Sequence, residues 1–120
     1  MPIQVYWHKM NFDTQKVERF FKERRVAFQS VDLKRHRLGR REAELLVRGP
    51  GPRIALDLED VRVKSHPVAY TSDMETIIGY VLENPRFLKS PLTRSGNTVV
   101  AGYDEALLER LAGAEPRAPK

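Results

Sequence analysis

Cysteine and histidine, the residues that most often supply nucleophiles, redox groups and metal ligands, are scarce in this sequence. There is no cysteine among the 120 residues, which excludes disulfides, thiolate metal sites and cysteine nucleophiles. His8, His36 and His66 are far apart and match no metal-binding spacing such as H-E-x-x-H. The sequence therefore predicts no metal site, and we expect no other cofactor.

Charge is the second source of candidate chemistry, and its densest cluster is basic. The run from 34 to 41 holds five Lys and Arg side chains and no acid, so it could contact phosphates. No aromatic side chain is interleaved for base stacking, and no recognition-helix motif is visible. A solvated basic loop is the favoured interpretation, with weak nucleic-acid binding as the alternative. The five side chains are Lys34, Arg35, Arg37, Arg40 and Arg41.

A short acidic segment lies near the middle of the chain. Asp57, Glu59 and Asp60 are close enough in sequence to suggest carboxylate acid–base chemistry. No nucleophile or second base accompanies them in the sequence, so the segment is interpreted as a solvated acidic turn.

Length and composition indicate a single domain, which we expect to span 1–113 with a flexible tail at 114–120. Hydrophobic residues make up 41% of the chain and charged residues 31%, as in globular proteins. No apolar run approaches the roughly 18 residues of a membrane span, and no signal-peptide pattern is visible at the N-terminus. These features predict a cytoplasmic protein that has no membrane partner.

The first half of the chain reads as strand, helix, strand, helix. Residues 3–7 are β-branched and aromatic and predict a buried central strand. Asp13 or Thr14 could cap a helix whose apolar face holds Val17, Phe20 and Phe21. A second strand over 26–31 would then run parallel to the first. A second helix is expected over 40–47, with Ala43, Leu45 and Leu46 as its apolar members.

The second half contains one segment that is hard to interpret and three that are clear. Residues 53–70 fit either an alternating strand or helical turns, and we adopt the helical interpretation. Thr71 or Ser72 is expected to cap a strongly periodic helix with Met74, Ile77, Ile78, Val81 and Leu82 on one face. Two short strands follow, joined by a turn at 95–97. Gly102 to Asp104 then precede a last helix with Leu107, Leu108 and Leu111 inward.

The run from 83 to 105, ENPRFLKSPLTRSGNTVVAGYDE, resembles the arsenate-reductase (ArsC) family, which includes the Spx transcription regulators. That family has "NP-x-LL-x-RPL", a hairpin and "VGFDE" before its last helix. The resemblance covers nearly the whole chain and implies an α/β, thioredoxin-like fold. This fold is a four-stranded mixed sheet flanked by helices, with a small helical insertion at about 53–84. It also implies that the Ser90–Pro91 peptide bond is cis.

The resemblance also locates the expected chemistry and shows that its key groups are replaced. The family carries a nucleophilic cysteine in the loop after the first strand, at the N-terminus of the first helix, where N–H groups favour a thiolate. Asn11 occupies that position here. Ser90 stands where the family usually has an arginine, and Phe12 and Asp13 replace small polar residues. We therefore predict no catalytic residue and no thiol-dependent arsenate reduction.

The remaining site candidates are His8, Lys9, Asn11, Ser90 and Pro91. His8 and Lys9 could bind an anion, although solvated loop residues are the simpler interpretation. Ser90 and Pro91 could pair with an extended peptide or merely shape a core turn.

From the resemblance to Spx we predict a redox-inactive pseudoenzyme that binds a protein partner or acts as a regulator. One alternative is a vestigial or thiol-independent enzyme that binds glutathione or an oxyanion at the 8–14 loop. Another is non-specific nucleic-acid binding through the 34–41 loop. The sequence does not identify the partner.

Overall fold

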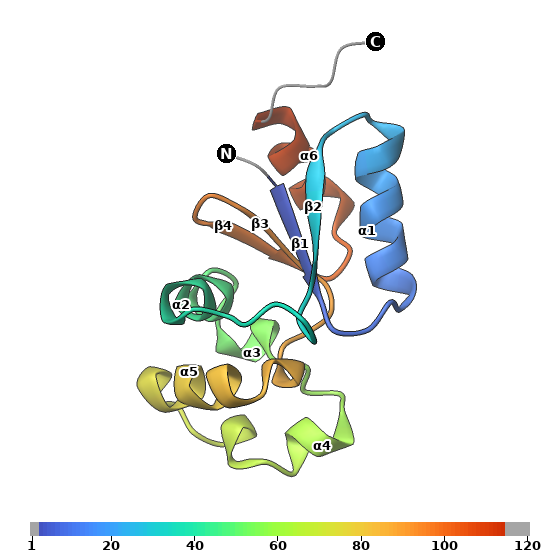
Figure 1. The fold of residues 1–120 in the computed structure, drawn as a ribbon. Helices are drawn as coiled ribbons and strands as arrows, with labels where there is room; N and C mark the ends of the chain where they lie inside the picture. Colours follow the sequence, from blue (N-terminus) through green and yellow to red (C-terminus); the bar gives the residue numbers. More distant parts are fainter. Residues whose placement is uncertain (1–2, 115–120) are drawn as a thin grey trace.

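The computed structural model describes residues 3–114, and its centre is a four-stranded sheet (Figure 1). The strands are β1 (Ile3–Trp7), β2 (Phe28–Asp32), β3 (Leu92–Ser95) and β4 (Thr98–Ala101). Their order in the sheet is β2-β1-β3-β4, with β1 and β2 parallel and the other two neighbouring pairs antiparallel. The predicted mixed sheet, its parallel pair and the central place of the first strand are confirmed.

Helices cover both faces of this sheet. One face carries α1 (Phe12–Glu23) and α6 (Glu105–Ala114), and the other carries α2 (Arg40–Arg48), α3 (Pro52–Ala55) and α5 (Met74–Glu83). Short turns α4 (Val61–Lys64), η1 (Pro67–Ala69) and η2 (Pro85–Phe87) complete the chain. Figure 1 shows α3, α4 and α5 grouped below the sheet. Apart from Ala114, the tail predicted at 114–120 lies outside the described residues.

Side-chain alternation along β1 divides the core into two clusters. Ile3 and Val5 are fully buried against α1 and α6, where Phe21 is the largest fully buried side chain of that cluster. Tyr6 points to the opposite face and packs with the helices of the insertion side. Burying a large apolar side chain contributes about 1.5–3 kcal/mol to stability. The loop after β1 therefore begins at a strand that is firmly packed on both faces of the sheet.

The first helix begins earlier than predicted, because its cap is Asn11 rather than Asp13 or Thr14. The side-chain oxygen of Asn11 accepts a hydrogen bond from the backbone N–H of Thr14 at 2.9 Å. An N-cap residue bonds the N–H two or three positions on, so only Asn11 satisfies this geometry at the start of α1. The helix therefore starts at Phe12.

The cap of α5 is also corrected, from Thr71 or Ser72 to Asp73. The Asp73 carboxylate accepts from the Thr76 N–H at 3.2 Å. The predicted helix itself is confirmed, with Ile77 buried on its inner face. The last helix begins after Asp104, as predicted, and the Asp104 carboxylate accepts from the Leu107 N–H at 3.1 Å.

Two predicted apolar faces need correction. In α2, Val47 is buried beside Ala43 and Leu46, whereas Leu45 is only half-buried. In α6, the predicted inward residue Leu107 is 40% exposed. At these points the buried face of each helix differs by about one residue from the predicted face. Such a difference is expected where only two helical turns define the apolar pattern.

The segment 53–70, which fits either a strand or helical turns in sequence, forms helical turns as predicted, but it also contains one β-bridge. Leu56 pairs with Leu88 in antiparallel fashion, and it is flanked by a hydrogen bond from the Lys89 N–H to the Ala55 carbonyl at 2.7 Å. Leu56 is buried, whereas Ile54 is 52% exposed.

The chain before β3 turns sharply, and the Ser90–Pro91 peptide bond is cis, as predicted. Gly102, with φ of 68°, adopts a left-handed conformation that favours glycine. Its N–H donates to the Pro91 carbonyl at 2.9 Å, which joins the two ends of the β3–β4 hairpin. Among the helices of residues 3–114, none is long and apolar enough to cross a membrane.

Candidate functional site

Asn11 closes the N-terminus of α1 with its own side chain. Its amide oxygen accepts from the Thr14 N–H at 2.9 Å and from the Thr14 hydroxyl at 2.7 Å. Its amide nitrogen donates to the Ser90 carbonyl at 2.9 Å. A helix N-terminus otherwise offers free N–H groups to an anion or a thiolate. Here Asn11, the residue at the expected thiol position, covers the helix N-terminus, and both its amide oxygen and its amide nitrogen are hydrogen-bonded.

The Ser90 hydroxyl completes this network from the other side. It donates to the Lys9 carbonyl at 3.0 Å, accepts from the His8 N–H at 3.3 Å and lies 3.2 Å from the Thr14 hydroxyl. Ser90 is 4% exposed, and its carbonyl already accepts from Asn11. An extended peptide would have to share this carbonyl with Asn11, so the bond from Asn11 competes with peptide pairing at Ser90 and Pro91.

His8 is a buried residue rather than a solvated loop residue. Its ring nitrogen Nε2 lies 2.8 Å from the Leu88 carbonyl, which can only accept, so Nε2 carries a proton. Burial lowers the pKa of His8; the Leu88 carbonyl opposes this, and the nearby positive charge of Lys9 lowers the pKa further. The ring is therefore neutral at pH 7 and keeps a lone pair on Nδ1.

Lys9 leaves the same loop in a different direction and pairs with the acidic segment. Its ammonium nitrogen lies 3.6 Å from the Asp57 carboxylate, with half of the lysine side chain exposed. Such a partly solvated pair contributes at most about 1 kcal/mol. Asp60 has a structural role as well, because its carboxylate caps α4 by accepting from the Arg62 N–H at 2.9 Å.

The hollow beside Asn11 is unsuited to an oxyanion. It has a volume of about 390 Å³, and its charged lining consists of three carboxylates and two lysines, namely Asp13, Asp57, Glu59, Lys9 and Lys89. Asp13, which replaces a small polar residue of the family, would repel an anion. Two further acids, which the sequence analysis interpreted as part of a solvated turn, reinforce this repulsion. Phe12 does not cover this end of the helix, because its side chain is 81% exposed.

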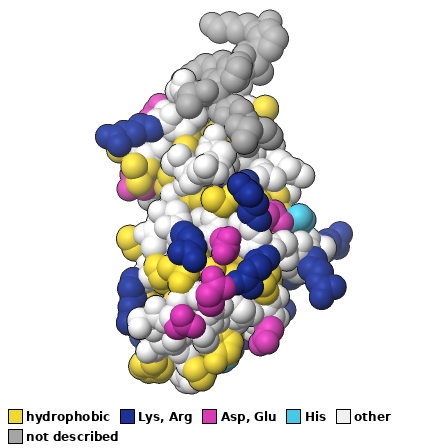
Figure 2. Space-filling model, turned by 90° about the vertical axis from the view of Figure 1, so that its left-hand side faces the viewer, with side chains coloured by type: hydrophobic (Ala, Val, Ile, Leu, Met, Phe, Trp, Pro, Cys, Tyr) yellow, Lys and Arg dark blue, Asp and Glu magenta, His cyan; other side chains and the backbone are white. Residues whose placement is uncertain are grey.

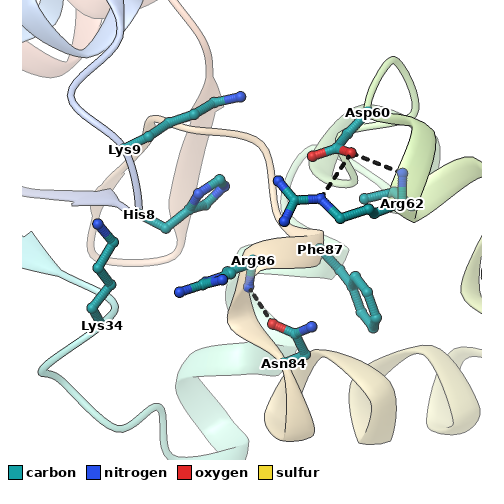
Figure 3. A pocket seen from close by; sticks show the side chains of 9 residues that line it. His8, Lys9, Lys34, Asp60, Arg62, Asn84, Arg86 and Phe87 are labelled. Atoms are coloured by element: carbon teal, nitrogen blue, oxygen red, sulfur yellow. Dashed lines mark hydrogen bonds and ion pairs between the residues drawn. The ribbon is translucent and has the colours of Figure 1, made fainter.

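A second hollow, of about 300 Å³, lies on the other side of His8 and Lys9 and is rich in cations (Figure 3). Its lining includes Lys34, Arg62 and Arg86 but neither Asn11 nor Ser90. Arg62 and Arg86 were missed in the sequence because each is a single basic residue without a motif. Only the tertiary fold brings α4 and η2 to the loops that follow β1 and β2.

Two of the five cations of the basic run have acidic partners among residues 3–114. Arg40 forms an ion pair with Glu75, whose other oxygen lies 3.7 Å from Arg48, and Arg35 lies 4.0 Å from Asp32. On the face shown in Figure 2, dark-blue and magenta side chains are interspersed rather than separated into patches. This arrangement gives little support to a continuous phosphate-binding surface along 34–41.

A polar cluster under the run connects it to the sheet. Glu42 accepts from the Tyr6 hydroxyl at 2.8 Å and lies 3.1 Å from the His36 ring nitrogen. The pKa of Tyr6 is raised to about 12, mainly by burial and then by the hydrogen bond to the Glu42 carboxylate and its negative charge. Burial alone would raise the pKa of Glu42, but the Gly39 N–H, the Tyr6 hydroxyl and His36 together hold it below its ordinary value.

Comparison with known proteins identifies the fold. No family model and no curated protein matches the chain. Among solved structures, a putative ArsC family related protein from Bacteroides fragilis superposes with a TM-score of 0.78 at 16% identity, covering 92% of this chain and 99% of that chain. The chain has the arsenate-reductase fold.

Two further structures with the arsenate-reductase fold agree. The YffB (PA3664) protein has a TM-score of 0.76 at 18% identity, covering 95% of this chain and 99% of the other. An arsenate reductase from Vibrio cholerae has a TM-score of 0.74 at 10% identity, covering 94% and 97%. Identities this low show a shared fold and leave the chemistry to the residues of this chain.

Proposed function

We propose that this protein is a redox-inactive, arsenate-reductase-like module that acts by binding a protein partner in the cytoplasm, in a regulatory role similar to that of Spx. The observation that carries the proposal is the bonding of Asn11. The residue at the expected thiol position donates to Ser90 and accepts from Thr14. An N-cap of this kind stabilises a helix by about 0.5–2 kcal/mol. The position therefore contributes stability where a reductase would need a reactive thiol.

Exposed apolar side chains next to Asn11 offer a surface for the partner. Phe12 is 81% exposed and Met10 is 42% exposed, on the two sides of Asn11 in sequence. Aromatic residues and methionine are enriched in protein interfaces, and one exposed aromatic side chain can dominate binding. We place the partner contact at these two residues.

The alternatives have weaker support. Binding of glutathione or an oxyanion at the 8–14 loop would need open N–H groups, but the Thr14 N–H is bonded to Asn11, and the adjacent hollow carries three carboxylates. Nucleic-acid binding through 34–41 would be weakened because Arg40 and Arg35 have acidic partners, which leaves three of the five cations without an ion pair among residues 3–114. The regulatory binding module is therefore the function we put forward.

Affinity capture from the native host tests the proposal, using the wild-type protein, Phe12→Ser and Tyr70→Ser as baits. Tyr70 is 77% exposed and lies at the end of η1, so it is a matched control for the loss of an exposed aromatic ring. We expect one protein to be retained by the wild type and Tyr70→Ser and to be lost with Phe12→Ser. The same dependence should hold when that protein is purified and titrated. Equal retention by all three baits would contradict the proposed surface.

A second measurement addresses the absence of redox chemistry. The purified protein should reduce neither arsenate nor a disulfide when supplied with glutathione or a dithiol. Turnover above a no-protein control that survives metal removal would show that the module is an enzyme.

A further inference from the structure

The cation-rich hollow is formed by residues from four separate parts of the chain. His8 and Lys9 follow β1, Lys34 follows β2, Arg62 lies in α4 and Arg86 lies in η2. In Figure 3 the guanidinium groups of Arg62 and Arg86 and the ammonium of Lys34 are arranged around His8. These residues are far apart in sequence, so the fold itself concentrates the positive charge.

The positive charge of this hollow is only partly neutralised. Four cationic side chains face a single carboxylate, Asp60, which lies 3.7 Å from the Arg62 guanidinium. Lys9 has its own partner in Asp57. Within residues 3–114, neither Lys34 nor Arg86 forms an ion pair. Like charges held together repel one another, and an anion placed between them would remove that cost.

The walls of the hollow are held in place before any ligand arrives. His8 is fixed by the Leu88 carbonyl at 2.8 Å, and the Arg86 N–H is bonded to the Asn84 side chain at 3.2 Å. Val63 and Phe87 form an apolar part of the lining and are almost fully buried. Prearranged polar groups beside an apolar wall are typical of small-molecule sites.

We propose that this hollow binds the phosphate or diphosphate group of a small molecule, held by Arg62, Arg86 and Lys34. Guanidinium forks bind phosphate oxygens in pairs, and a lysine adds a mobile point charge. A volume of about 300 Å³ is at the lower end of small-molecule sites and suits a diphosphate with a small organic group against Val63 and Phe87. The proposed site goes beyond the partner surface at Met10 and Phe12 and does not depend on it.

The test is a calorimetric titration of the full-length protein with inorganic pyrophosphate. The variants are Arg86→Gln, Arg62→Gln and the double variant, with Arg19→Gln as control because Arg19 is an exposed cation on α1 outside this hollow. Each single variant removes charged hydrogen bonds to the phosphate, so each should weaken binding on the order of tenfold or more. The double variant should bind no pyrophosphate measurably, whereas the control should stay within about twofold of the wild type.

Circular dichroism and thermal melting establish that each variant is folded, and the His8 ring signals in NMR provide a second readout. We expect these signals to shift when pyrophosphate is added to the wild type and to stay unchanged in the double variant. No binding to the wild type at millimolar pyrophosphate would overturn the proposal, as would equal weakening by Arg19→Gln. A short DNA duplex distinguishes the source of the phosphate. Duplex binding that displaces pyrophosphate and is lost in Arg86→Gln would assign the hollow to nucleic acid and refute a small-molecule ligand.

Discussion

Replacing Asn11 by alanine should destabilise the protein by more than the loss of a helix cap. The substitution removes the cap on Thr14, which contributes about 0.5–2 kcal/mol. It also removes the donor to the Ser90 carbonyl, in a residue that is 4% exposed. Leaving a buried carbonyl unpaired costs about 1–3 kcal/mol. Together these losses predict a decrease of about 2–4 kcal/mol in unfolding free energy, out of a typical 5–15 kcal/mol.

Two matched variants separate the contributions in a urea titration followed by circular dichroism. Asp73→Ala removes a cap of the same kind from α5, so we expect a loss of about 1 kcal/mol. Asn11→Ser keeps a capping oxygen but cannot reproduce the amide donor to Ser90, so its loss should lie between those of the two alanine variants. If Asn11→Ala costs no more than Asp73→Ala, the bond to Ser90 carries no stability and our account of the closed loop is wrong.

Three further predictions address chemistry, pH and salt. Asn11→Cys should create a thiol whose alkylation profile gives a pKa below the free value of about 8.5, because a helix N-terminus favours a thiolate. Arsenate turnover should still be absent in this variant. A thiol pKa at or above the free value would contradict the placement of residue 11 at the helix N-terminus. The pKa of Glu42 is lowered in the folded protein, so its stabilising contribution is complete above its unfolded pKa of about 4.3 and is lost as pH falls through the folded value. The stability difference between wild type and Glu42→Gln should therefore shrink as the solution becomes more acidic than about pH 4.3; a difference that stays unchanged down to pH 2 would refute this. Duplex DNA should bind only weakly, with a salt slope of roughly −0.9 per phosphate contact that flattens in the triple alanine variant of Arg37, Arg40 and Arg41; a sequence-specific footprint at physiological salt would contradict the expected weak binding.

The sequence predicted the elements whose signals are local. The period of Ile77, Ile78 and Val81 defined α5 because a helix face repeats within a few residues. The buried strand at 3–7 and the hairpin after Pro91 were likewise visible in residue types and turn signals. The cap of α1 was less certain, because Asn11, Asp13 and Thr14 can all cap a helix. Only the three-dimensional path of the loop decides which oxygen meets the third N–H.

The site depended more on tertiary contacts, and here sequence reasoning was less complete. The resemblance pointed to Asn11 in the loop after the first strand and to Ser90 before the strand proline, but it did not indicate that the two residues are bonded to each other. The buried ring of His8 is held by a hydrogen bond to the Leu88 carbonyl, which lies 80 residues away in sequence. Arg62 and Arg86 carry no local signal at all. Their shared hollow exists because α4 and η2 are brought beside the loops that follow β1 and β2.

The short stretch from Phe87 to Ser90 links the two hollows. Phe87 lines the cation-rich hollow, the Leu88 carbonyl holds His8 and the Ser90 carbonyl holds Asn11. The Leu56–Leu88 bridge fastens the same stretch to the turn after α3. Substitutions at His8 and Asn11, which hold two different carbonyls of this stretch, therefore act on one continuous piece of backbone. A double-mutant cycle between them should show a non-zero coupling free energy, since additivity is expected for distant sites without shared partners.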